Sequence, residues 1–145
     1  RHIGSKEKLF ELFHYKLKND LTNTIIIKTS NQIGIKKIEV LLDTYIDIIL
    51  EYGYKCTALF LILSLEKKAF STPPKTLYTF LRNYVDEAAK NGEFNENYDT
   101  DYIFKALYSS IRGTVFDWCT YKGSSDLKGD FSLTFDILIN KFKKQ

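Results

Sequence analysis

The apolar residues of this chain recur at intervals of three and four along almost its whole length, which is the spacing of one face of an α-helix. Glycines, prolines and short polar stretches interrupt the pattern, and such interruptions are where helices commonly end or begin. The pattern predicts an all-α fold with six helices. The expected ranges are about 6–27, 35–51, 54–65, 72–91, 99–121 and 126–142.

Residues with known capping preferences fix some of these boundaries. Ser5 and Asp99 are predicted N-caps, because their side-chain oxygens can accept from free N–H groups of a first helical turn. Thr72 precedes two prolines, which are tolerated at a helix start. The β-branched run at residues 23–27 has the chemistry of a strand, so a short strand or an early end of the first helix stays open.

The composition places the chain among ordinary helical proteins of one domain. Its 145 residues are 44% hydrophobic and 27% charged, enough for a core that buries about 68 to 70% of the unfolded surface. A net charge of +3 is too small to indicate nucleic acid or a membrane as a partner. The longest apolar stretches, such as residues 58–63, are much shorter than a membrane span of roughly 20 residues, and the expected location is cytoplasmic.

The opening segment at residues 1–9, RHIGSKEKL, reads as the end of a unit whose beginning lies elsewhere. It resembles the junction in TetR-family transcriptional regulators at which the recognition helix of a helix-turn-helix passes into a long connecting helix. Ile3 stands where that family usually has Phe. The resemblance implies that residues 1–5 end a truncated DNA-binding domain and that residues 6–145 form a ligand-binding and dimerisation domain. Operator DNA would then be bound only through the missing N-terminal domain.

A second resemblance lies near the other end of the chain. Residues 113–119, GTVFDWC, with the following turn, are similar to the penultimate helix of TetR-family proteins. In that family the last two helices pack on their symmetry mates as a dimeric four-helix bundle, so a homodimer is expected. A purely intramolecular helical pair remains the alternative. The expected interface residues are Phe104, Ile111, Val115, Phe131, Phe135, Leu138 and Phe142.

The many aromatic residues also predict a small-molecule site, which in the resembling family lies within the helical domain. Large rings from several apolar segments can enclose a cavity that suits a small apolar or aromatic effector, although a fully packed aromatic core is the alternative. Arg112 beside Gly113 is a candidate contact for a carboxylate on such an effector, or else an exposed or intersubunit charge. The expected ligand-binding residues are Phe13, Leu17, Tyr45, Ile49, Phe60, Tyr84, Tyr108 and Trp118.

Enzymatic signals are weak. The chain has none of the common nucleophile, nucleotide or zinc-protease motifs, and His2 and His14 are too far apart in sequence to share a helical face at i, i+4. No catalytic residue, metal site or cofactor is therefore predicted. The leading hypothesis is the effector-binding and dimerisation domain of a bacterial TetR-like regulator. The alternative is a helical protein-interaction module without a small-molecule ligand.

Overall fold

A computed structural model of the chain describes residues 2–66 and 76–145, with side chains from residue 4 onward. Within these residues the structure has six helices and no strand, so the predicted all-α class is confirmed. The predicted start signal at Thr72 lies outside the described residues. The helices are α1 (His2–Thr29), α2 (Gly34–Tyr52), α3 (Tyr54–Glu66), α4 (Thr76–Lys90), α5 (Thr100–Thr120) and α6 (Leu127–Phe142).

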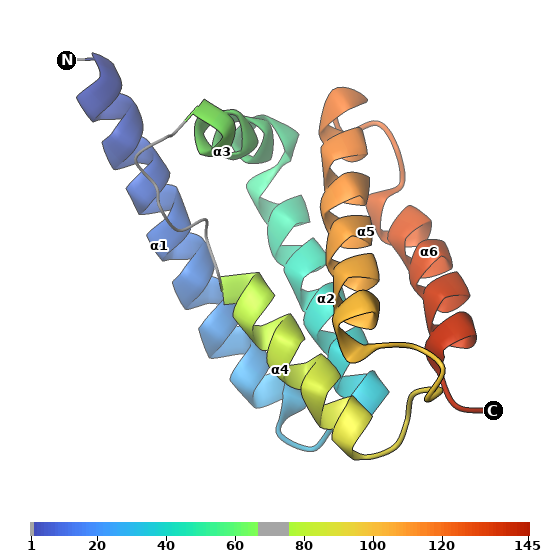
Figure 1. Cartoon of the computed structure of the whole chain (residues 1–145). Helices are drawn as coiled ribbons and strands as arrows, with labels where there is room; N and C mark the ends of the chain where they lie inside the picture. The colour runs from blue at the N-terminus through green and yellow to red at the C-terminus, as the bar shows by residue number, and fades with distance from the viewer. Residues whose placement is uncertain (1, 67–75) are drawn as a thin grey trace.

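Helix α2 is central to the packing. It contacts α1, α3, α4 and α6, while α5 packs against α3, α4 and α6 (Figure 1). The apolar residues of α2 are largely buried over more than one face, as a core helix requires. Helices α1 and α6 lie at opposite edges of the bundle (Figure 1). The two edge helices therefore each have an outer side that no described helix covers.

Helix α1 is longer than the sequence indicated. It already includes Ser5, so the prediction of Ser5 as N-cap is wrong, and it continues through residues 23–27 to Thr29, so the strand alternative is wrong. A serine or glycine inside a helix costs only about 1 kcal/mol or less, which does not force a break near Gly4. The isoleucines at residues 25–27 remain helical because Ile25 is fully buried and the helix carries it into the core.

Helix α3 turns away from α2 at Gly53, whose φ of 84° is readily reached by glycine. The two helices are bent by 105° at this break. The sequence of α3, YKCTALFLILSLE, is apolar on all sides, yet only Thr57 and Leu63 in it are buried. A helix that is apolar all round is ordinarily enclosed, so α3 presents more apolar surface than the described helices cover.

The second half of the chain follows the predicted boundaries closely. Asp99 caps α5 by accepting from the backbone N–H of Asp101, as predicted, and Asp126 caps α6 by accepting from Gly129. The end of α6 is tied back to the α4–α5 connection. The N–H of Asn95 donates to the carbonyl of Phe142 at 2.7 Å, and the N–H of Lys144 donates to Glu93 at 2.8 Å.

Gly34 at the start of α2 is required by its surroundings, and this predicts a specific loss of stability. Its φ is 57°, and a Cβ at this position would run into the carboxylate of Glu93. We expect Gly34→Ala to lower the free energy of unfolding by about 1 to 3 kcal/mol through backbone strain and this clash. Urea unfolding followed by the fluorescence of Trp118 measures the change.

Gly113 supplies a matched control for that substitution. It lies inside α5, and nothing lies within 4 Å of the position where a Cβ would be added. Gly113→Ala is expected to leave stability unchanged or to raise it by up to about 1 kcal/mol, since alanine is the better helix former. An equal loss of stability in both variants would contradict this account of Gly34.

Candidate functional site

Two of the predicted effector residues meet where the first part of α1 crosses α3. Phe13 stacks on Phe60 with ring centroids 4.5 Å apart, and Phe10 stacks on the same ring at 5.0 Å. Phe13 also meets Tyr52 edge to face at 5.3 Å. Of residues 4–16 of α1 only Phe10 is buried, so this ring cluster is the main apolar attachment of that part of the helix.

A second group of predicted residues gathers around Arg112 on α5. The guanidinium of Arg112 lies 4.8 Å from the ring centroid of Tyr108, a favourable cation–π distance. Burial raises the pKa of Tyr108, and burial likewise raises the pKa of Tyr45, whose phenol is near enough to Tyr108 and Arg112 to interact electrostatically with both. Tyr45 and Tyr108 thus lie in one neighbourhood, with a cation at its edge.

The remaining predicted effector residues are part of the core. Leu17, Ile49 and Trp118 are 5%, 2% and 5% exposed and pack in the main apolar cluster. Tyr84 is equally buried, and its hydroxyl lies 3.1 Å from the hydroxyl of Thr29. The structure therefore distributes the eight residues over a ring cluster, a tyrosine neighbourhood and the core, and it does not bring them together around one described cavity.

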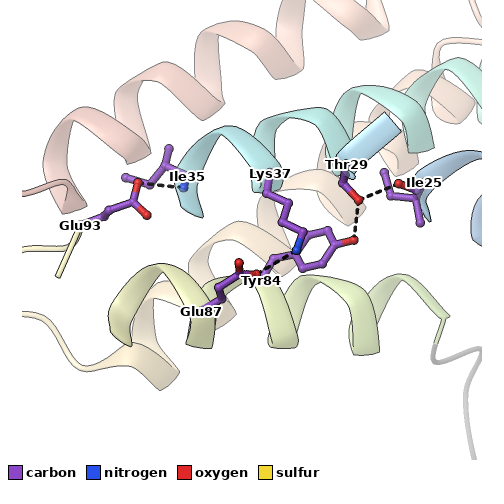
Figure 2. A network of polar contacts seen from close by, with 7 residues as sticks. All are labelled: Ile25, Thr29, Ile35, Lys37, Tyr84, Glu87 and Glu93. Atoms are coloured by element: carbon purple, nitrogen blue, oxygen red, sulfur yellow. Dashed lines mark hydrogen bonds and ion pairs between the residues drawn. The ribbon is translucent and has the colours of Figure 1, made fainter. Parts of the chain in front are cut away.

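Figure 2 shows the polar contacts around Tyr84. The hydroxyl of Thr29 at the end of α1 donates to the carbonyl of Ile25 at 2.7 Å, which leaves its oxygen free to accept from Tyr84. Lys37 of α2 lies 4.6 Å from the centroid of the Tyr84 ring and donates to Glu87 at 3.1 Å. This network joins α1, α2 and α4, and it has the character of a structural tie between them.

The carboxylate of Glu93 caps α2 from another part of the chain. Its Oε1 accepts from the backbone N–H of Ile35 at 3.1 Å (Figure 2). The N-cap residue itself, Ile33, has no side-chain oxygen that could accept from the first turn. Its Oε2 is inaccessible to solvent and has no hydrogen-bond partner within the described residues. Sequence reasoning missed Glu93, because a cap supplied from 58 residues away leaves no local signal.

The predicted dimer-interface residues lie mostly inside the domain. Six of them are between 0% and 5% exposed, and Leu138 is half-buried. The outer faces of α5 and α6 carry other apolar side chains, none of which was among the predicted interface residues. These exposed residues are Tyr102, Phe116, Leu133 and Ile137.

An open groove of about 350 Å³ lies between α3 and α5. None of the eight predicted effector residues lines it, but Arg112, the predicted candidate contact for a carboxylate, does, together with Ser109 and Gly113 of the same helix. The remaining lining is supplied by Leu61, Ser64, Leu65 and Phe116. The groove thus combines an apolar wall from α3 with a polar strip along α5.

Comparison with known proteins assigns no family. No family model matches the chain, and neither a curated protein nor a solved structure is found to be similar to it. Among the described residues, no group of three or more His, Cys, Asp or Glu side chains is placed to hold a metal ion. In the same residues no single helix is both long and apolar enough to cross a membrane, although the bent pair of α2 and α3 together has such a composition.

A short hydrogen bond links α1 and α2 beside the ring cluster. The hydroxyl of Tyr52 donates to Oδ2 of Asp20 at 2.6 Å, and Lys16 donates to the same oxygen at 3.1 Å. The bond from Tyr52, followed by the contact with Lys16, lowers the pKa of Asp20. Burial and the bond to Asp20 raise the pKa of Tyr52, so the phenol stays protonated and remains a donor.

This pair predicts a pH-dependent contribution to stability. Because the pKa of Asp20 is lower in the folded chain than its unfolded value of about 3.9, its contribution is present above that value and is lost as the pH falls through the folded pKa. We expect Tyr52→Phe to lower the free energy of unfolding at neutral pH by about 1 kcal/mol or less, since the carboxyl is partly exposed. Urea titrations from about pH 7 to pH 3 should show the difference shrinking. A constant difference across that range would contradict the role of Asp20.

Proposed function

We propose that this chain is the effector-binding and dimerisation domain of a bacterial, cytoplasmic, TetR-like transcriptional regulator. The observation that carries the proposal is that α6 has two apolar faces. Its inner face, including Phe131 and Phe135, is buried against the domain. On its outer side Leu133 and Ile137 are 65% and 62% exposed. A second copy of the chain is the occupant that the resemblance implies for this outer face.

The geometry of the outer face fits a two-fold interface. Leu133 and Ile137 are four residues apart and therefore form one stripe along α6. In a two-fold dimer this stripe would pack against the same stripe of the second copy, so each apolar residue would be buried in both subunits. The neighbouring α5 adds the exposed ring of Tyr102 to this face. These residues replace the buried ones in the proposed interface.

The placement of α1 is consistent with a regulatory role. In the proposed protein the DNA-reading unit is joined to the N-terminal end of α1. That part of the helix is held on α3 through Phe10, Phe13 and Phe60, whereas its later part is anchored in the core by Leu21 and Ile25. An effector that binds better to one orientation of α1 would shift the spacing of the two DNA-reading units in the dimer and so change operator affinity.

A helical interaction module without a small-molecule ligand is the second candidate. It is favoured by the exposed apolar residues of α1 and α3, which a dimer through α6 leaves uncovered. They are Leu9, Leu12, Leu59, Ile62 and Leu65. Under this hypothesis the chain would be monomeric alone and would bind a partner helix along these residues.

The proposed dimer predicts the effect of a charge on α6. Ile137→Glu would place two like charges near the symmetry axis of an apolar interface, which costs several kcal/mol, so we expect the dimer dissociation constant to rise at least about 100-fold. Sedimentation equilibrium of the wild-type chain and the variant measures the change. Ile27→Glu is the matched control, because Ile27 is 75% exposed on α1, away from α6, and should leave dimerisation unchanged.

Two results would contradict the proposal. A wild-type chain that stays monomeric at all accessible concentrations would remove the dimer and favour the interaction module. A dimer that withstands Ile137→Glu but is dissociated by Ile27→Glu would move the interface to α1. Circular dichroism of both variants establishes that each remains folded before either result is interpreted.

A further inference from the structure

We propose that the groove between α3 and α5 binds a small molecule that carries one carboxylate and a short apolar tail. This inference deepens the proposed function, on which its regulatory meaning rests, by assigning a chemical class to the effector and a place where it binds. The groove is large enough for such a ligand, because its volume of about 350 Å³ is at the lower end of the range for ligand sites. The carboxylate would bind on the α5 side and the tail on the α3 side.

Arg112 provides the charge that selects a carboxylate. It lines the groove, and its guanidinium lies over the ring of Tyr108 rather than against an acidic side chain. No ion pair formed within residues 4–66 and 76–145 includes Arg112. By contrast Arg82, on the neighbouring α4, is paired with both Asp86 and Asp101. Arg112 is therefore a cation that is already oriented by a ring and still able to donate to an anion.

Ser109 provides a second donor beside that cation. It is three residues before Arg112, so both side chains project from the same side of α5 into the groove. No hydrogen bond of the described residues engages the Ser109 hydroxyl, whereas the hydroxyl of Ser64 across the groove already donates to the carbonyl of Leu61 at 2.7 Å. The polar strip can thus donate from Ser109 and Arg112 to the two oxygens of one carboxylate.

Gly113 leaves the space that the head group needs. Nothing lies within 4 Å of the position where its Cβ would be, so the surface of α5 is open next to both donors. Across the groove, Leu61 and Leu65 of α3 form an apolar wall, and Phe116 of α5 extends the apolar lining beyond Gly113. Leu65 is 81% exposed, and a tail laid against it would be removed from water together with the leucine. The arrangement of one cation, one hydroxyl and an apolar wall complements an amphiphilic monocarboxylate.

Octanoate is the probe that tests this inference, with octan-1-ol as the neutral molecule of equal chain length. Isothermal titration of the full chain at neutral pH should show octanoate binding once per chain and octan-1-ol binding at least about tenfold more weakly. Arg112→Gln should weaken octanoate about tenfold while leaving octan-1-ol unchanged. Lys105→Gln is the matched control, because it removes an exposed positive charge from the same helix outside the groove lining and should change neither affinity.

Gly113→Leu tests the location, because it fills the open space on α5 and should abolish binding of both molecules while the fold is retained. The inference is overturned if octanoate and octan-1-ol bind alike, if Arg112→Gln has no effect, or if Gly113→Leu still binds. It is also overturned if octanoate does not bind but Gly113→Leu dissociates a dimer, because the groove is then covered by another copy of the chain. A monomeric chain that binds octanoate through Arg112 would refute the proposed dimer and leave this site standing.

Discussion

The burial of α2 is the constraint on which the rest of the structure depends. A helix with apolar residues over most of its circumference has to be enclosed, and it takes α1, α3, α4 and α6 to do so. Enclosure leaves the N–H groups of its first turn away from bulk water, so a partner must come from elsewhere. Glu93 supplies that partner from the connection after α4, and only a glycine at position 34 leaves room for it. The burial of α2, its cap by Glu93 and the glycine at position 34 therefore depend on one another.

The same cap links distant parts of the chain. The backbone of Glu93 accepts from Lys144, so the segment that caps α2 is also the segment that receives the end of α6. Nearby, the Lys37–Glu87 pair and the Tyr84–Thr29 bond join α2, α4 and the end of α1. One end of the bundle is thus tied by directional polar contacts. The other end, where α1 crosses α3, is held by the stacked rings of Phe10, Phe13 and Phe60, with the Tyr52–Asp20 hydrogen bond beside them and an exposed Lys6–Glu66 ion pair between the two helices.

The sequence predicted the helices well because helical periodicity and caps are local properties. The ranges of α2, α3, α5 and α6 agree with the predicted ones to within about two residues, and Asp99 caps as expected. The start of α1 was wrong because a capping residue such as Ser5 is also tolerated inside a helix. Local patterns in the sequence could not predict which surface each apolar helix face packs against. Periodicity identifies an apolar face without saying whether it meets its own chain or another, which is why Phe131 and Phe135 were expected at an interface and are found in the core.

More apolar surface is exposed on residues 4–66 and 76–145 than the described helices cover. Leu133 and Ile137 on the outer side of α6, and Leu59, Ile62 and Leu65 of α3, are exposed although they are residues typical of a protein interior. The two regions differ in one respect that separates their roles. The α6 stripe consists of apolar residues one helical turn apart, which can pack against the same stripe of a second copy, whereas α3 faces a groove that contains an arginine and an open glycine. A surface that places a charge beside apolar walls discriminates among small molecules better than it associates with a copy of itself, because two copies would bring like charges together.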